Sequence, residues 1–230
     1  MEFPTSYEIG VDEVGRGCFY GPVVASAVVL PLTLHEEEWK MIKDSKKLNE
    51  KKRIQLTEFI KEKALYYAIG ECSHTEIDKI NILKASLKAM HRAIHDCYKQ
   101  HKDKQLPMFE KIYVDGNHFI PYIPPGDDTE YIPYECIEQG DNKRLSIAAA
   151  SILAKTYRDQ WIIDECKKKP ILYEYGMDKH KGYGTKKHME ALKLKGPLDG
   201  YRQSYKPIKE LLIKFPLPPQ SQVVDDIISS

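Results

Sequence analysis

A short apolar strand that leads into two carboxylates and then into glycines constrains this chain more than any other stretch. Residues 7–17 read Tyr-Glu-Ile-Gly-Val-Asp-Glu-Val-Gly-Arg-Gly, and their alternation places Ile9 and Val11 on one face of a predicted strand. Asp12 and Glu13 then fall at the end of that strand, where the glycines allow the backbone to turn. Two carboxylates beside bare backbone suit a divalent cation with a phosphate next to it, although solvated turns have the same pattern.

The size and composition of the chain are those of an ordinary globular protein. Its 230 residues can bury a substantial core in one large domain or two small ones, and 42% apolar with 30% charged residues is a typical balance. We find no internal repeat and no domain break before Pro216, so we predict one domain over 1–215 and a disordered tail over 216–230. Because the net charge is only +1, any nucleic-acid partner must be attracted by local basic clusters.

Cysteine usage and hydrophobicity indicate the compartment. The five cysteines are widely spaced without a Cys-x-x-Cys pair, which argues against a disulfide framework or a zinc site and for reducing surroundings. The N-terminus lacks a basic region followed by an apolar run, and no stretch approaches ~20 apolar residues. We therefore expect a soluble, cytoplasmic protein without a membrane partner.

Hydrophobic periodicity and turn signals predict strands that alternate with helices. Strands are expected at residues 23–30, 64–69, 111–114 and 131–137. Helices are expected up to residue 63, over 75–100 and 144–167, from 185 to 196, and over 207–215. In the helix over 75–100, Thr75 and Asp78 resemble a capping pair, and the predicted core stripe is Ile80, Leu83, Leu87, Met90, Ile94 and Cys97. The small residues at 146–151 would let the helix over 144–167 lie close to a neighbouring element.

Two further aspartates occupy positions like those of Asp12 and Glu13. Asp115 follows the strand at 111–114 and Asp141 stands just before the helix over 144–167, although a turn and a helix N-cap would also explain them. Because parallel and mixed sheets gather strand ends at one edge, we expect the four carboxylates to meet. Their repulsion would raise their proton affinity unless cations neutralise it. Two divalent cations could also clamp the attacking and leaving oxygens of a phosphoryl displacement.

Two basic segments indicate a partner that carries phosphates. In residues 43–53, which hold six lysines and arginines, Ser45 or Asn49 could simply cap a helix. Residues 178–188 hold Tyr183 between two glycines among lysines, so the ring could stack on a sugar or base while the lysines meet phosphates. A flexible surface loop is the alternative for this second segment. Together with the four carboxylates, the two Lys-rich loops suggest a nuclease.

Eight short motifs, each weak alone, occur in an order that is specific as a set. The set closely resembles the ribonuclease HII family and runs from about residue 7 to residue 205. The motifs are Asp12-Glu13-Val14-Gly15-Arg16-Gly17, Gly21-Pro22-Val23-Val24, Asp44-Ser45-Lys46-Lys47-Leu48, Val114-Asp115-Gly116-Asn117, Gly140-Asp141, Ser146-Ile147-Ala148-Ala149-Ala150-Ser151-Ile152-Leu153-Ala154-Lys155, Arg158-Asp159 and His180-Lys181-Gly182-Tyr183-Gly184-Thr185.

This resemblance implies an α/β protein with a ribonuclease H-like mixed sheet flanked by helices and a helical C-terminal part. It implies a metal-dependent endoribonuclease that hydrolyses RNA in RNA–DNA hybrids. Such an enzyme would also cut on the 5′ side of single ribonucleotides embedded in duplex DNA, leaving 3′-hydroxyl and 5′-phosphate ends. By motif, the catalytic residues, which would bind Mg²⁺ or Mn²⁺, are Asp12, Glu13, Asp115 and Asp141.

The resemblance also implies which residues bind the substrate. Gly15, Arg16 and Gly17 would read the 2′-hydroxyl, largely through their backbone, because this group alone distinguishes RNA from DNA at a given sugar. Tyr183 would meet the deoxyribose that follows the ribonucleotide. Phosphate contacts are expected from Ser45, Lys46, Lys47 and Asn81, and such lysine contacts would make binding strongly salt-dependent.

The chain departs from the family pattern near its C-terminal end. Residues 201–205 read Tyr-Arg-Gln-Ser-Tyr, where family members often have His-Arg-x-Ser-Phe. The related ribonuclease HIII usually lacks the arginine of Gly-Arg-Gly. Two rival functions are a hybrid-binding protein that does not cut, which would gain nothing from four repelling carboxylates, and a resolvase- or transposase-like nuclease, which would cut DNA lacking ribonucleotides. We expect a monomer, and the tail from Gln220 lacks the aromatic pair of a sliding-clamp motif.

Overall fold

A five-stranded mixed sheet forms the centre of the computed structural model, which describes residues 1–33, 39, 41–42, 49–126 and 130–217. The strand order is β3-β2-β1-β4-β5. The strands β1 to β3 pair antiparallel, whereas β1, β4 and β5 run parallel. Their bounds are Glu8–Val14 for β1, Val23–Val29 for β2, Tyr66–Cys72 for β3, Lys111–Asp115 for β4 and Tyr134–Ile137 for β5. This confirms the mixed sheet that the resemblance implies.

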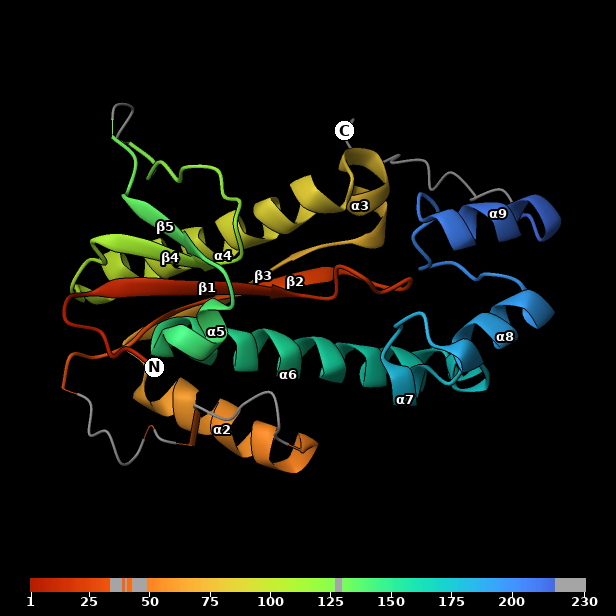
Figure 1. Cartoon of the computed structure of the whole chain (residues 1–230), viewed down its shortest axis with the longest axis horizontal. Coiled ribbons are helices and arrows are strands. Elements are labelled where there is room, and N and C mark those ends of the chain that lie inside the picture. Colours follow the sequence, from red (N-terminus) through yellow and green to blue (C-terminus); the bar gives the residue numbers. More distant parts are fainter. Residues whose placement is uncertain (34–38, 40, 43–48, 127–129, 218–230) are drawn as a thin grey trace, which may run out of the picture.

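Helices cover both faces of the sheet (Figure 1). The helices α3 (His74–Ile80) and α4 (Ile82–Lys104) lie on one face, and α2 (Glu50–Lys63) and α6 (Leu145–Lys168) lie on the other. Alternation along β1 explains this arrangement, because Ile9 and Val11 are buried in the core cluster that contains α4. Gly10, between them, faces α6.

The close approach of α6 to the sheet depends on small residues, as the sequence predicts. A Cβ atom at Gly10 would lie only 2.2 Å from the carbonyl carbon of Ser146 in the first turn of α6. Ser146 and the alanines at 148–150 are fully buried. A larger residue at Gly10 would therefore push α6 away from β1, because the nearest obstacle is backbone that cannot rotate aside.

The C-terminal part is helical, as expected, and lies at one end of the sheet (Figure 1). It comprises the 3-10 helix η2 (Pro170–Tyr175) and the helices α7 (Met177–His180), α8 (Lys186–Lys195) and α9 (Lys206–Lys214). Tyr20, from the loop between β1 and β2, packs into the core of this C-terminal part. Its ring makes an edge-to-face contact with the ring of Tyr201, with 5.1 Å between the ring centroids. None of the helices in the described ranges is long and apolar enough to cross a membrane.

The single helix predicted over 75–100 is wrong, because the chain breaks at Asn81. Asn81 has a φ of +67° and caps α4 by accepting a 3.2 Å hydrogen bond from the Lys84 amide. The predicted capping pair is also wrong, since Ser73 and Glu76 form the capping box of α3. The prediction that Leu83 belongs to the core stripe is wrong as well, because Leu83 is 42% exposed. Helical spacing continued across the break and concealed it.

Candidate active site

Parallel pairing of β1 and β4 brings two of the predicted carboxylates to neighbouring positions. Val11 lies opposite Val114 in this pair, so Asp12 and Asp115 are each one residue further along adjacent strands. Asp12 and Glu13 lie within the last three residues of β1, and Asp115 ends β4. The negative charge of Asp115 acts on both Asp12 and Glu13 and raises their pKa values. These three carboxylates therefore lie near one another at this edge of the sheet.

Asp12 is buried close to two other carboxylates, those of Glu13 and Asp115. Its side chain is 7% exposed and its Oδ1 accepts a 2.7 Å hydrogen bond from the Glu13 amide. Burial raises the pKa of Asp12 well above its ordinary value, and the neighbouring charges of Glu13 and Asp115 raise it further. A hydrogen bond from the Ser151 side chain on α6 partly offsets these effects.

Glu13 shares this environment but has a cation beside it. Burial raises the pKa of Glu13, and the Asp115 charge raises it further, while Arg16 lowers it through a hydrogen bond and its charge. Arg16 Nη1 lies 3.1 Å from Glu13 Oε1, and the Arg16 side chain is half exposed. Because the Arg16 side chain is exposed and can change its conformation, another cation could replace it as the partner of the Glu13 carboxylate.

Asp141 is held near Asp115 by the backbone that precedes it. Asp141 lies in the short helix α5 (Gly140–Lys143) and is 5% exposed. The Gly140 amide donates a 2.6 Å hydrogen bond to Asp115 Oδ1. The alternative that Asp141 is the N-cap of the long helix is wrong, because α5 intervenes and Arg144 occupies the cap position of α6.

The donor chemistry of this edge fits divalent cations, although its side chains are not arranged around one. Carboxylate oxygens are the ligands that Mg²⁺ and Mn²⁺ prefer, and a cation would relieve the repulsion that raises the pKa of Asp12. Across 1–33, 39, 41–42, 49–126 and 130–217, no three His, Cys, Asp or Glu side chains form a ready-made ligand group. Instead, Glu13 contacts Arg16 and Asp115 accepts from Gly140.

Glu8, also in β1, was not predicted from the sequence, and its environment differs from that of the four predicted carboxylates. Glu8 is 3% exposed. Its Oε2 accepts from Arg144 Nη1 and its Oε1 from Ser146 Oγ, both at 2.7 Å. Glu8 is therefore neutralised by its partners and fixes the start of α6 to β1. A lone acid within an otherwise apolar run was the available signal, because such a group needs a buried partner.

Two buried arginines support the Gly-Arg-Gly segment, Arg158 by packing against Gly15 and Arg202 by a hydrogen bond to the Arg16 carbonyl. Gly15 has a φ of +92°, and a Cβ there would lie 2.3 Å from Arg158 Nε, so this position requires glycine. A Cβ at Gly17 would meet no described atom within 4 Å. The Arg16 carbonyl accepts a 3.0 Å hydrogen bond from Arg202 Nη1 and another from the Tyr205 hydroxyl. The segment is thus rigid on its protein side and open at Gly17.

Arg158 also joins the chain that follows this segment to the loop that carries Tyr183. Its guanidinium is fully buried and donates to three backbone carbonyls, those of Tyr20, Pro22 and Lys181, at 2.8–3.2 Å. Arg158 stands in a motif quoted above, but only the structure reveals this role.

Tyr183 lies against the segment that follows Gly17. Cys18 and Tyr183 form an isolated antiparallel bridge, and the Phe19 amide donates a 2.8 Å hydrogen bond to the Gly182 carbonyl. Tyr183 is 37% exposed, with Lys155 Nζ 5.6 Å from the centroid of its ring. Burial of the hydroxyl raises the pKa of Tyr183 to about 12. The structure therefore brings the Gly-Arg-Gly segment and Tyr183 together.

The predicted phosphate contacts remain predictions. Ser45, Lys46 and Lys47 lie outside the described residues. The Asn81 side chain caps α4, which is the local role that best explains its position. The cap alternative for residues 43–53 is correct at Asn49, whose side chain accepts a 2.9 Å hydrogen bond from the Lys52 amide at the start of α2.

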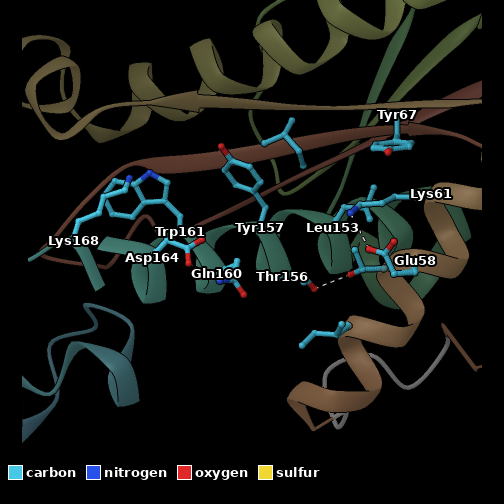
Figure 2. A pocket seen from close by; sticks show the side chains of 13 residues that line it. Glu58, Lys61, Tyr67, Leu153, Thr156, Tyr157, Gln160, Trp161, Asp164 and Lys168 are labelled. Atoms are coloured by element: carbon cyan, nitrogen blue, oxygen red, sulfur yellow. Dashed lines mark hydrogen bonds and ion pairs between the residues drawn. The ribbon is translucent and has the colours of Figure 1, made fainter. Parts of the chain in front are cut away.

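The hollow of about 400 Å³ between α2, α6 and β3 is separate from these residues. Figure 2 shows the side chains that line it, among them Tyr67, Leu153, Tyr157 and Trp161. It contains none of the predicted catalytic or substrate-binding residues. The carboxylate edge is thus distinct from this hollow.

Comparison with known proteins identifies the family to which this arrangement belongs. The family model described as Ribonuclease HII matches residues 9–207. This chain belongs to the ribonuclease HII family. A Ribonuclease HII from Neisseria gonorrhoeae is 42% identical over 203 residues, which are 88% of this chain and 94% of that relative. The family assignment makes the chain a metal-dependent ribonuclease of the ribonuclease H class.

Solved structures agree with the ribonuclease HII assignment. The ribonuclease H2 from Pyrococcus horikoshii OT3 has a TM-score of 0.68 and 25% identity, and the match covers 90% of this chain and 98% of that one. Bst-RNase HIII, solved in complex with Mn²⁺, has a TM-score of 0.69 and 18% identity, with 91% of this chain and 70% of the other covered. The second likeness shows the common fold alone.

Proposed function

We propose that this ribonuclease HII family member hydrolyses RNA in RNA–DNA hybrids and incises on the 5′ side of single ribonucleotides embedded in duplex DNA, leaving 3′-hydroxyl and 5′-phosphate ends. The observation that carries the proposal is that the group of repelling carboxylates at the end of β1 is followed within a few residues by the open backbone at Gly17, and that the next residue, Cys18, bridges to Tyr183. This supports a site in which the carboxylates would serve cleavage and the neighbouring backbone and Tyr183 would contact the sugars. Such activity would serve ribonucleotide excision repair and DNA replication in the cytoplasm.

Four carboxylates would hold the metal ions in this proposal, namely Asp12, Glu13, Asp115 and Asp141. When bound, two Mg²⁺ or Mn²⁺ ions would supply an activated water and stabilise the leaving 3′-oxygen. The protein's part is to favour the charged form of these carboxylates, through the hydrogen bond from the Glu13 amide to Asp12 and that from the Gly140 amide to Asp115. Glu13 would leave Arg16 to join them, which frees the Arg16 guanidinium for a substrate phosphate.

Recognition of the ribonucleotide would fall to backbone and to one aromatic ring. The open position at Gly17 allows the backbone of Gly15, Arg16 and Gly17 to approach the 2′-hydroxyl. The carbonyl of Arg16 is already engaged by Arg202 and Tyr205, so the segment needs little reorganisation on binding. Tyr183 would pack on the next sugar and favour one without a 2′-hydroxyl.

Phosphate contacts are proposed for Ser45, Lys46, Lys47 and Asn81, and those of the two lysines are tested by varying the salt concentration. Each lysine that neutralises a phosphate releases a counterion, so the affinity for duplex falls with log[salt] by a slope of about 0.9 per contact. A double substitution of Lys46 and Lys47 by Ala should lower this slope by about two while leaving the 5′ cut position unchanged.

The decisive experiment compares three duplexes with Mg²⁺ and with Mn²⁺. They are a DNA duplex with one ribonucleotide, a continuous RNA–DNA hybrid and an all-DNA duplex of the same sequence, with cut sites mapped at nucleotide resolution. The proposal predicts one cut 5′ of the ribonucleotide, cuts within the hybrid and none in the all-DNA duplex. An intact ribonucleotide duplex with both metals, or cutting of the all-DNA duplex, would overturn it, and tight binding without cutting would point to a hybrid-binding protein.

A further inference from the structure

The backbone that carries Tyr183 is held at nearly every polar group. The Lys181 carbonyl accepts from Arg158 Nη1 at 2.8 Å, and the Gly182 carbonyl accepts from the Phe19 amide at 2.8 Å. The Tyr183 amide donates to the His180 carbonyl at 2.9 Å. Lys181 has a φ of +52°, which is unfavourable for a non-glycine residue and depends on such bonds, whereas the φ of +84° at Gly182 suits glycine. These bonds fix the position of the backbone that carries Tyr183.

His188, on α8, supplies the side-chain contact to the Tyr183 carbonyl. It is fully buried, and its Nδ1 lies 2.9 Å from that oxygen. Its Nε2 lies 2.8 Å from the hydroxyl of Tyr201. Because a carbonyl oxygen only accepts, Nδ1 must carry the proton, and Nε2 then accepts from the Tyr201 hydroxyl. The two contacts together select one tautomer of His188.

A second histidine stacks on the first and holds the neighbouring amide. The rings of His180 and His188 lie 4.2 Å apart at 18°. The His180 Nδ1 accepts from the Gly182 amide at 3.2 Å, and its Nε2 donates to the Tyr175 carbonyl at 2.7 Å. Burial lowers the pKa of both histidines, so both remain neutral near pH 7, as the stacking and the hydrogen bonds require.

We infer that His188 is a positioning residue for substrate discrimination: with Tyr201 behind it, it holds the Tyr183 carbonyl and so aims the Tyr183 ring at the sugar that follows the ribonucleotide. The inference rests on the proposed function. Packing alone does not account for His188, since both nitrogens of its fully buried ring are engaged in hydrogen bonds. One of these bonds is made to Tyr183, the residue proposed to contact that sugar. Loss of the Nδ1 contact should therefore affect discrimination before it affects cutting.

Two substitutions of His188 separate positioning from packing. In His188→Asn the amide nitrogen occupies about the place of Nδ1 and can still donate to the Tyr183 carbonyl. In His188→Gln the amide reaches the place of Nε2, so it can meet Tyr201 but leaves the carbonyl to the Thr185 amide alone. Both variants replace a buried ring with an amide and lose similar packing, so each is the control for the other.

The measurement is the ratio of single-turnover rates on the single-ribonucleotide duplex and on the continuous hybrid, together with the melting temperature. We expect His188→Gln to lower the ratio about tenfold, which corresponds to about 1.4 kcal/mol, and His188→Asn to retain most of it, with similar melting temperatures. Tyr183→Ala should lower the ratio as much, and His188→Gln should add nothing to it. Equal ratios in wild type and both variants, or equal loss in both, would overturn the inference.

A milder variant and a spectrum keep the test valid if His188→Gln does not fold. Tyr201→Phe removes only the hydroxyl that donates to Nε2 of His188 and so supports this tautomer, and we expect it to lower the ratio two- to fivefold. Nitrogen-15 spectra of labelled histidine in the wild type should show the proton of His188 on Nδ1, and a proton on Nε2 would contradict the inference without any activity measurement. If the wild type cuts the hybrid but not the single-ribonucleotide duplex, the proposed function fails instead.

Discussion

The Gly140 amide donates a 2.6 Å hydrogen bond to Asp115 Oδ1, and this bond joins the end of β4 to the start of α5. Asp141 follows Gly140 directly, so this contact places the backbone that carries Asp141 beside Asp115. A Cβ at Gly140 would lie 2.6 Å from Ile147 Cδ1 and 3.3 Å from Asp115 Oδ1, so a larger residue there would require the Ile147 side chain to move. The edge of the sheet is thus built to bring like charges together rather than to separate them.

Replacing Asp115 with Asn should abolish cutting while preserving the fold. The amide oxygen can still accept from Gly140, but the charge is lost. We expect cleavage of the single-ribonucleotide duplex to fall by more than the ~10–100-fold typical of residues that only support metal ligands, with duplex affinity within a few-fold of wild type. Rates and fluorescence anisotropy measure the two effects. The exposed Asp103→Asn is the matched control, and undiminished cleavage in Asp115→Asn would remove Asp115 from the site.

Metal ions should stabilise the protein through Asp12. The neighbouring charges of Glu13 and Asp115 destabilise ionised Asp12, so a bound cation relieves strain in the folded state. At a concentration ~100 times its dissociation constant, Mn²⁺ should add about 2.7 kcal/mol to the free energy of unfolding. Asp12→Asn should be at least as stable as wild type in EDTA and gain less from Mn²⁺. Thermal melts with and without metal measure this, and an equal gain in both proteins would contradict it.

Two neighbouring glycines should respond differently to alanine. Gly15→Ala forces a Cβ onto the Arg158 side chain in a left-handed backbone conformation, so it should lower the free energy of unfolding by about 1–3 kcal/mol. Gly17→Ala meets no described atom within 4 Å and should leave stability within about 0.5 kcal/mol. If Gly17 approaches the 2′-hydroxyl, its substitution should nevertheless reduce cleavage. Urea denaturation and cleavage rates together separate the two effects.

Tyr205 and Arg202 should stabilise the Arg16 carbonyl to different extents. Tyr205→Phe removes one hydroxyl but leaves the Arg202 bond in place, so it should cost about 1 kcal/mol. Arg202→Lys also loses the 2.9 Å bond to the Gly21 carbonyl and should cost more, because a lysine cannot reproduce the planar arrangement of donors. Urea denaturation of both variants measures the order, and a larger loss in Tyr205→Phe would contradict it.

His188 should make the fold sensitive to mild acid. Its pKa is lowered to about 4 by burial, whereas an unfolded histidine titrates near 6.5. Between these values the unfolded chain binds the extra proton, so stability falls as the pH decreases from about 6.5 to about 4, by up to about 3 kcal/mol. Denaturation of wild type and His188→Asn at pH 7.5 and pH 5 checks this, since the variant should lose less. Equal losses would show that other groups cause the acid sensitivity.

Local patterns in the sequence predicted most elements of this fold. The strand around Val11, the strand that ends at Asp115 and the helix capped by Thr185 follow from alternation, periodicity and capping residues. The break between two helices at Asn81 was not predicted, because the helical spacing of apolar residues continues across it. The side-chain contact of Asp78 with the amides of Gln203 and Ser204 was not predicted either, since its partners lie far away along the chain.

The residues that can do chemistry are recognisable from their order in the chain: carboxylates at strand ends, glycines beside them and an ordered set of motifs that indicates the family. The residues that support them are recognisable only in the folded protein. Arg158, Arg202 and His188 act on backbone carbonyls of loops that are close to them only after folding. The physical reason is that a buried polar side chain needs a partner but carries no periodic signal of which one, and that choice is made when the chain closes its long-range contacts.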